Sequence, residues 1–233
     1  MPRKSKIPVL EMCARFKKCA SACVGDVLDR DYKMGDQFLS MGIKPILPHM
    51  HVSGPAFTVY GARDPRTEEE HPRGKFAEFG MFKAMYPGCV VVQNSESERH
   101  TGQWGEMMSY VAKQHGAHGV VIDGGSRDYE GLVRIPDWPV FVRYTSGIES
   151  YPRFRAVDMQ VPITMSGTLT AYVRINPGDL VVGDADGVII VPQEIAEEVL
   201  IKTEAMEVKE ENTRRDLAAG VSIEEVYLRY GRL

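Results

Sequence analysis

Apolar positions follow two different spacings along the chain, and the two spacings alternate. Where apolar side chains recur every three or four residues, the pattern is typical of a helix with one face packed on a core. We expect helices of this kind over 20–31, 75–86, 105–116 and 193–219. Gly220 ends the last of them, and the sequence SIEE, residues 222–225, predicts a capping box that opens a further short helix.

Short runs of β-branched and aromatic residues, bounded by glycine or proline, lie between these helices and are typical of strands. We expect strands within 52–62, 88–94, 119–125, 138–146, 161–167 and 170–192. Within the last range, GDADG predicts a tight turn, because it is too short for a calcium loop and lacks that loop's terminal glutamate. This mixture of strands and helices predicts the α/β fold class with a helical C-terminal tail.

The composition is that of an ordinary globular protein. The 233 residues are 43% hydrophobic and 26% charged, which is enough to bury a substantial core. No repeat, low-complexity tract or long Gly/Ser/Pro linker divides the chain, so we expect one domain over residues 20–233. The basic sequences PRKSKI and RFKK precede it and predict a solvated N-terminal arm over residues 1–19. The polar stretch 63–74 predicts a solvated loop, with a lid over a site as the alternative.

Charge and hydropathy exclude several classes of protein. A net charge of -4 and a pI of about 5.9 argue against a nucleic-acid-binding surface. No apolar run approaches the ~20 residues of a membrane-spanning helix, and no signal-peptide pattern follows the first basic residues. We therefore expect a cytoplasmic protein that binds neither nucleic acid nor membrane. The four cysteines form no CxxC pair, which predicts reduced, structural thiols.

Motifs of several common enzyme classes are missing from the sequence. There is no glycine-rich dinucleotide loop, no P-loop and no GxSxG nucleophile elbow. The six histidines lack the HExxH spacing of zinc proteases. His49 and His51 would share one face of a strand, where a metal site is the alternative to an incidental pair.

Charged residues follow one of the apolar predicted strands. In VVIDGGSRDYEG, residues 120–131, the apolar run ends at Asp123, and Arg127 and Asp128 come just after two glycines. Ligands of open α/β sheets bind beyond the carboxyl ends of the strands, so these residues are candidates for a site. The alternative is that Arg127 and Asp128 only pair with each other at the surface or cap a helix.

A glycine-rich turn precedes the helix expected over 105–116. In HTGQWGEMMS, residues 100–109, the free amides at the helix start are those of Glu106, Met107 and Met108. Carboxylates and phosphates bind readily to such helix starts. The turn is therefore a second candidate for a binding site, although many loops share this pattern.

Three segments in this order resemble one protein family. They are GEMMS, residues 105–109, GGSRD, residues 124–128, and PGDLVVGDADGVIIVP, residues 177–192, with twenty residues between Glu106 and Arg127. The chain resembles the RraA-like proteins and class II pyruvate aldolases, which act on 4-hydroxy-4-methyl-2-oxoglutarate and 4-carboxy-4-hydroxy-2-oxoadipate. The resemblance implies a swivelling β/β/α-type fold, assembled as trimers or hexamers with active sites between subunits.

The resemblance also implies roles for individual residues. Arg127 matches the substrate-binding and catalytic arginine, and Asp128 matches the residue that holds a divalent metal. Glu106 stands where characterised aldolases carry an aspartate, which leaves open whether it acts as a base or positions water. The loop whose amides hold the pyruvyl carboxylate matches Gly105, Glu106, Met107 and Met108.

Two further acidic positions of the family bear on this chain. A glutamate from the neighbouring subunit's C-terminal helix belongs to the family's site, and Glu204, Glu207 and Glu211 all lie in the matching region. Many relatives also place an acidic residue three positions after the aspartate. Glu130 falls one position short of that place, so we leave it out of the site.

The expected activity is the retro-aldol cleavage of a 4-hydroxy-2-oxo acid to release pyruvate, and the same chemistry allows oxaloacetate decarboxylation. Cleavage leaves a pyruvate enolate whose negative charge must be held. Magnesium, manganese or another divalent metal on Asp128 would do so as a Lewis acid, together with the forked guanidinium of Arg127.

An alternative of a different class is a regulator that binds an RNA-degrading enzyme. A third hypothesis keeps the lyase but gives it a longer substrate, with Arg134 and Arg143 shaping the pocket.

Overall fold

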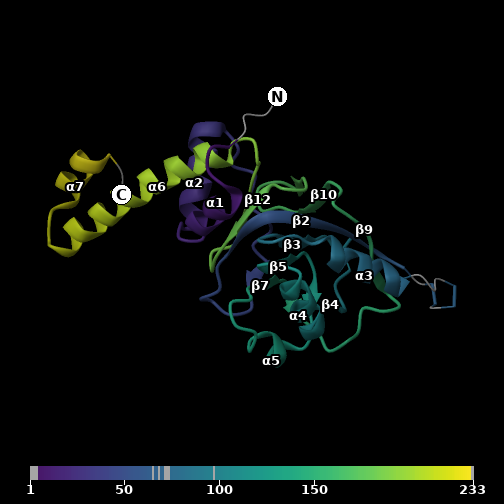
Figure 1. The fold of residues 1–233 in the computed structure, drawn as a ribbon. Coiled ribbons are helices and arrows are strands. Elements are labelled where there is room, and N and C mark those ends of the chain that lie inside the picture. The colour runs from purple at the N-terminus through teal and green to yellow at the C-terminus, as the bar shows by residue number, and fades with distance from the viewer. Residues whose placement is uncertain (1–4, 65, 68, 71–73, 97, 232–233) are drawn as a thin grey trace.

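One mixed sheet organises the molecule (Figure 1). The computed structural model describes residues 5–231 except 65, 68, 71–73 and 97. The main sheet has the order β1-β7-β5-β3-β2-β12-β13, and β9 pairs with the second half of β2. The neighbours β2, β3, β5 and β7 run parallel, and the other pairs are antiparallel. The strands span Lys44–Pro45 (β1), Val52–Arg63 (β2), Val90–Gln93 (β3), Gly119–Ile122 (β5), Val140–Val142 (β7), Phe154–Met159 (β9), Leu180–Gly183 (β12) and Val188–Val191 (β13).

Two small sheets accompany the main one. The strands β4 (Gly102–Trp104), β6 (Gly125–Ser126) and β8 (Tyr144–Thr145) form a parallel sheet. Each of them follows one of the parallel strands β3, β5 and β7 after an interruption of the chain. The strands β10 (Ile163–Ser166) and β11 (Tyr172–Ile175) form an antiparallel pair. The interruptions matter for function, because they carry the polar residues described below.

The central strands are largely apolar because both of their faces are covered. In β5, Val120 and Ile122 pack into a core cluster with residues of α3 and α4, whereas Val121 points into a second cluster with β10 and β11. Neighbouring residues of a strand point to opposite faces, so a strand that is covered on both sides has no face on which a polar side chain would reach water. The helices span Val9–Phe16 (α1), Ser21–Tyr32 (α2), Gly74–Ala84 (α3), Glu106–Gln114 (α4), Tyr129–Leu132 (α5), Ala196–Ala218 (α6) and Ile223–Tyr230 (α7).

A third core cluster joins the two ends of the chain. The helices α1, α2 and α6 pack together on the apolar residues of β12 and β13. Met12, Cys13 and Phe16 of α1 are buried there, and burying one such side chain contributes about 2 kcal/mol. The solvated arm predicted for residues 1–19 is therefore wrong for α1. Its apolar residues have helical spacing, whereas the prediction rested on the flanking basic sequences.

The C-terminal helices extend away from the sheets (Figure 1). The first half of α6 packs on the core, and α7 folds back on its far end, where Tyr230 Oη donates to Asp216 Oδ2 over 2.8 Å. Ser222 caps α7 as the sequence predicts, because its Oγ accepts from the amide of Glu225 over 3.2 Å. Among the described residues, no helix combines the length and the apolar character needed to cross a bilayer.

The structure confirms the mixed α/β fold with a helical C-terminal tail, together with the predicted helices and strands. The predicted turn in GDADG is also present, since Asp184 and Gly187 exchange backbone hydrogen bonds of 3.0 and 3.2 Å. The Asp184 carboxylate accepts from the amide and hydroxyl of Ser21, each over 2.7 Å, and so holds the start of α2. All four cysteines are free and buried. The stretch 63–74, with its lid alternative, lies partly outside the described residues.

Candidate functional site

The parallel strands β3, β5 and β7 all end at one edge of the main sheet, and the candidate residues gather there. Beyond this edge the chain passes through the polar interruptions into β4, β6 and β8. Ligands of open α/β sheets bind beyond the carboxyl ends of the strands. The topology thus brings the segments around residues 95–108 and 123–131 together, although they are separate in the sequence.

Arg127 and Asp128 lie between β6 and α5. The amide of Arg127 donates to the carbonyl of Trp104 over 2.8 Å, which ties this segment to β4. Asp128 has a φ of 62° and precedes α5, and its carbonyl accepts from the amide of Leu132 over 2.9 Å. Aspartate tolerates this left-handed conformation better than most residues. The two side chains are 37% and 40% exposed, and their contact is long, with Arg127 Nε 3.4 Å from Asp128 Oδ1.

The glycine-rich turn at the start of α4 contacts Asp128 directly. The amide of Glu106 donates to Asp128 Oδ2 over 3.3 Å. A Cβ on Gly105 would lie 2.6 Å from the same oxygen, so glycine allows this close approach. A carboxylate at a helix N-terminus is stabilised by the free amides and the helix dipole. The amides of Met107 and Met108 belong to the same turn. The side chain of Met107 is exposed, whereas that of Met108 is partly buried against the core.

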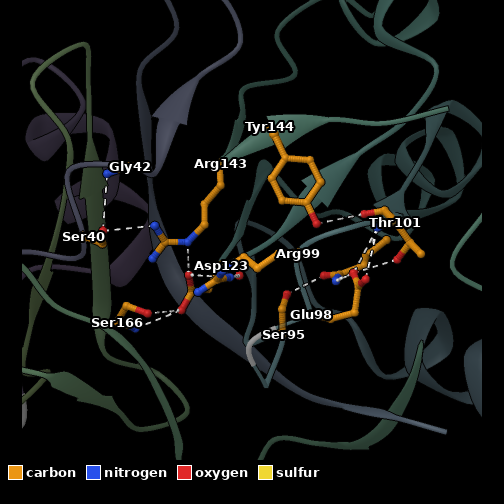
Figure 2. A network of polar contacts seen from close by, with 11 residues as sticks. Ser40, Gly42, Ser95, Glu98, Arg99, Thr101, Asp123, Arg143, Tyr144 and Ser166 are labelled. Atoms are coloured by element: carbon orange, nitrogen blue, oxygen red, sulfur yellow. Dashed lines mark hydrogen bonds and ion pairs between the residues drawn. The ribbon is translucent and has the colours of Figure 1, made fainter. Parts of the chain in front are cut away.

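Asp123 belongs to a different, buried environment. Figure 2 shows its carboxylate between the guanidinium of Arg143, that of Arg99 and Ser166. The amide and hydroxyl of Ser166 donate to it over 2.9 and 2.8 Å, and Arg99 Nη1 donates to its carbonyl over 2.7 Å. The sequence analysis grouped Asp123 with Arg127 and Asp128 because they are close in sequence. In the structure, the contacts of Asp123 with Arg143, Arg99 and Ser166 instead hold the strand ends together. Arg143, a candidate for the substrate pocket, is engaged in the same network.

A second buried carboxylate, which the sequence did not single out, organises the loop that leads to the glycine-rich turn. Glu98 accepts from Thr101 Oγ1 over 2.8 Å (Figure 2). It also accepts from the amide of His100 over 2.8 Å and from Gln103 Nε2 over 2.7 Å. Burial by itself would raise the pKa of Glu98, but these hydrogen bonds outweigh it and hold the pKa below its usual value. Glu98 thereby fixes the chain just before β4. An acid followed by threonine and glutamine was the only sequence signal for it.

Three of the cavities in the structure lie away from Arg127 and Asp128. One of about 520 Å³ is lined by Lys17, His49, His51 and Trp138 among others. It lies at the amino ends of β2 and β7, on the opposite edge of the sheet from Asp128. The other two are lined in part by residues of the N-terminal segment and by Gln193 and Glu194. On a single chain, the side chains of Arg127 and Asp128 themselves are half-exposed.

The described residues contain no cluster of three or more His, Cys, Asp or Glu that could enclose a metal ion, and His49 and His51 therefore have no third ligand. The donors near the turn are the carboxylates of Asp128 and Glu106. Magnesium keeps several waters and takes only one or two protein carboxylates along with substrate oxygens. This donor set fits a hard divalent ion of that kind and does not fit a zinc site, which needs three or four protein ligands.

The three C-terminal glutamates have different surroundings. Glu204 accepts from Arg15 Nε over 2.7 Å, and this hydrogen bond lowers the pKa of Glu204. Glu207 accepts from the amide of Ala20 over 2.7 Å, at the start of α2. Glu211 is 72% exposed, and among the described residues it pairs only with Arg214 on its own helix. Two of the three thus fasten α6 to α1 and α2, and the third faces solvent.

The sequence analysis left Glu130 out of the predicted site, and in the structure its side chain lies at the surface. Its side chain is 86% exposed and contacts Arg134, the residue four positions later, at 3.5 Å. Arg134 is likewise at the surface of α5 and its following turn. Neither side chain shares a hydrogen bond or ion pair with Arg127, Asp128 or Glu106 in the described part of the chain. Both therefore serve as neutral surface positions for comparison.

Known proteins resemble this chain in sequence and in fold. The family model RraA-like, described as Aldolase/RraA, matches residues 21–190. A putative 4-hydroxy-4-methyl-2-oxoglutarate aldolase from Halalkalibacterium halodurans is 30% identical over 94% of both chains. Protein DlpA of Legionella pneumophila is 28% identical over 89% of this chain, which spans only 32% of that protein's length.

Two solved structures share the fold over most of their length. A protein described among novel cellulases from gut-associated microbes has a TM-score of 0.82 and 31% identity, covering 91% of this chain and 90% of that one. RraAS2 of Streptomyces coelicolor, described as an unusual member of the RNase ES inhibitor RraA family, has a TM-score of 0.74 and 26% identity, covering 88% and 97%. The family match covers more than half of the chain and includes Glu106, Arg127 and Asp128, so this protein belongs to the RraA-like family.

Proposed function

We propose that this protein is a divalent-metal-dependent lyase that cleaves a 4-hydroxy-2-oxo acid and releases pyruvate. One observation carries the proposal: a cationic guanidinium and a carboxylate, Arg127 and Asp128, sit half-exposed where the first turn of α4 presents its amides. Positive and negative groups side by side at a helix start suit a substrate that carries a carboxylate and needs a metal. The relative from Halalkalibacterium halodurans is named as a putative aldolase of the same reaction class, which supports the proposal.

The reaction requires that negative charge be held next to a 2-oxo group. Breaking the C3–C4 bond leaves its electron pair on the pyruvyl fragment as an enolate, and a proton later completes the pyruvate methyl group. We assign the pyruvyl oxygens to Arg127, whose planar fork binds two oxygens at once. The amides at the start of α4, from Gly105 to Met108, receive the carboxylate. Groups that bind the developing charge more strongly than the ground state lower the barrier.

A magnesium or manganese ion fits beside Asp128, with Glu106 as a second carboxylate nearby. When bound, such an ion supplies Lewis acidity at the 2-oxo group, a contribution of several kcal/mol. Asp128 is suited to hold it, because one of its oxygens is only weakly engaged by Arg127 at 3.4 Å. Glu106, whose carboxyl is half-exposed, accepts the C4 hydroxyl proton through a water molecule. The same residues serve oxaloacetate decarboxylation, in which carbon dioxide leaves in place of the aldehyde or ketone fragment.

A second copy of the chain completes the site in this proposal. The surface around Asp128 is open on one chain, whereas cleavage of this kind benefits from the exclusion of water. Glu211 is the C-terminal glutamate best placed to reach a neighbour, since Glu204 and Glu207 bind within their own chain. The trimers or hexamers with sites between subunits that the family resemblance implies would supply this second copy.

The test is pyruvate release from 4-hydroxy-4-methyl-2-oxoglutarate and from oxaloacetate, followed by coupling to lactate dehydrogenase. We expect activity with Mg²⁺, its loss in EDTA and recovery on adding Mg²⁺ or Mn²⁺. Asp128→Ala should abolish turnover, whereas the matched surface variant Glu130→Ala should retain it. Turnover that survives both EDTA and Asp128→Ala would remove the proposal.

A regulator of an RNA-degrading enzyme is the second candidate. The observation that favours it is the fold shared with RraAS2 at 26% identity over 88% of the chain. The check is a ribonuclease assay with and without a stoichiometric excess of the protein, and a pull-down of purified ribonuclease. Unchanged RNA cleavage together with no capture would exclude this role. Inhibition that persists in Asp128→Ala would separate it from the lyase.

A further inference from the structure

Gly131 lies in α5, three residues after Asp128, directly beneath the side chain of Glu106. A Cβ built on Gly131 would lie 2.2 Å from Oε2, 2.3 Å from Cδ and 2.9 Å from Cγ of Glu106. Real Cβ atoms essentially never come within 3.0 Å of a non-bonded heavy atom. The carboxyl group of Glu106 therefore occupies the space that any side chain at position 131 would fill.

Glu106 contacts α5 at two points because of this arrangement. Its backbone amide donates to Asp128 Oδ2 over 3.3 Å, and its carboxyl group lies over Gly131. Asp128 is the N-cap of α5 and Gly131 lies in its single turn, so these two contacts join Glu106 to the start and to the body of α5. Within the described residues, no hydrogen bond or ion pair holds the Glu106 carboxyl. The bare backbone of Gly131 is what gives it room on this face.

We propose that Gly131 is the positioning residue for Glu106. The missing side chain at 131 lets a glutamate, one methylene longer than an aspartate, extend across α5 and present its carboxylate beside that of Asp128. The inference rests on the proposed function for the chemical role of Glu106, but the geometric part can be tested without turnover. Position 131 thereby determines which acid, aspartate or glutamate, works at position 106.

The fold itself does not need a glycine at 131. Gly131 is not among the residues with a left-handed φ, so alanine fits its backbone. The three atoms nearest to such a Cβ all belong to the flexible Glu106 side chain. Alanine also favours a helix more than glycine does. Gly131→Ala should therefore displace the Glu106 carboxyl while the chain folds normally.

Gly80→Ala is a matched control. Gly80 is also a helical glycine, in α3, and a Cβ there meets nothing within 4 Å. Both variants should keep the thermal midpoint of the parent protein or raise it. Any change specific to Gly131→Ala then reports on Glu106 rather than on the loss of a glycine.

The activity experiment compares four proteins: the parent, Gly131→Ala, Glu106→Asp and Glu106→Asp/Gly131→Ala, each saturated with Mg²⁺. We expect Gly131→Ala to lower kcat by about tenfold or more with little change in KM, because a displaced catalytic group costs rate. The pH profile of kcat should shift in the same variant. In the Glu106→Asp background the added alanine should lower kcat less than it does in the parent, because aspartate lacks the Cδ and Oε2 atoms that lie nearest a Cβ at position 131.

A readout independent of turnover separates this inference from the proposed function. The Glu106 carboxyl carbon can be followed by ¹³C NMR in glutamate-labelled protein and assigned with Glu106→Gln. Its chemical shift should change in Gly131→Ala and not in Gly80→Ala, whether or not the parent cleaves the 2-oxo acid. The inference is wrong if Gly131→Ala leaves the NMR signal unchanged, as Gly80→Ala should. In an active parent, the same holds if neither variant changes kcat. If the parent is inactive but the signal moves, the lyase fails and the positioning stands.

Discussion

The amide of Glu106 donates to the carboxylate of Asp128 over 3.3 Å, and this hydrogen bond fastens the start of α4 to the start of α5. The two helices come from segments separated by β5 and β6, so the contact fixes the candidate site across the strand interruptions. Asp128 is also the proposed metal ligand. A substitution that removes its negative charge but keeps an acceptor oxygen can therefore separate metal binding from the hydrogen bond with Glu106.

Asp128→Asn keeps an acceptor oxygen for the Glu106 amide and tolerates the left-handed backbone, but it removes the negative charge. We expect Mg²⁺-dependent turnover to fall by about a hundredfold or more, with stability unchanged, as metal binding is lost. Asp128→Ala should lose turnover as well and should unfold about 1 kcal/mol more readily, because its Cβ is strained at a φ of 62°. Urea unfolding of the two variants measures the difference. Equal stabilities would argue against backbone strain at this position.

Arg127→Lys retains the positive charge but loses the fork that binds two oxygens. We expect KM for the 2-oxo acid to rise by about tenfold, which corresponds to the loss of one charge-assisted hydrogen bond. Arg134→Lys provides the control, because Arg134 is exposed and pairs only with Glu130 in the described structure. Steady-state kinetics with Mg²⁺ at saturation measures both. An unchanged KM in Arg127→Lys would place the substrate carboxylate elsewhere.

Asp123→Asn removes the counter-charge from two arginines at the strand ends. The side chain of Arg143 is only 15% exposed beside Asp123, so its guanidinium would lose its charged partner among the described residues. Breaking a buried pair on one side costs about 3–5 kcal/mol. The exposed change Glu130→Gln should stay within about 0.5 kcal/mol. Guanidinium-chloride unfolding curves provide the comparison, and a loss below about 1 kcal/mol for Asp123→Asn would mean that solvent screens the network.

Glu98 should make stability depend on pH. Its pKa is held below the unfolded value of 4.5, with hydrogen bonds from Thr101, His100 and Gln103 outweighing burial. A lowered pKa in the folded state means that the stabilisation is complete above the unfolded pKa and is lost as the pH falls through the folded pKa. Unfolding free energies measured from about pH 6 to about pH 3 should therefore decline less steeply in Glu98→Gln. Parallel curves for the two proteins would contradict this.

Local pattern was enough to predict most of the fold. The covered strands carry continuous apolar runs because both faces of β3 and β5 are buried, and Ser222 and Gly220 mark helix ends by their own chemistry. The spacing of Glu106, Arg127 and Asp128 located the candidate site, since two helix starts and a strand end are local features. Their contact through the Glu106 amide is consistent with that prediction.

Features that depend on distant partners were not accessible in the same way. Asp123 looked like a site residue because it follows an apolar strand, but Ser166 and Arg143 reach it only after the chain has folded. The basic residues around α1 suggested a solvated arm, while Phe16 is buried against strands far along the chain. The fit between Glu106 and Gly131 is likewise a matter of side-chain path, which sequence spacing does not describe.

The joining of α1 and α2 to α6 has a consequence for how the protein is made. Arg15 and the amide of Ala20 find their partners, Glu204 and Glu207, near the C-terminal end of the sequence. A ribosome releases the first segment long before the last, at about 5–20 residues per second. The faces of α1 and α2 that pack on α6 thus emerge about 170 residues before α6 is made, with β2, β12 and β13 as their earlier partners. Loss of α6 would leave those faces exposed and free to aggregate.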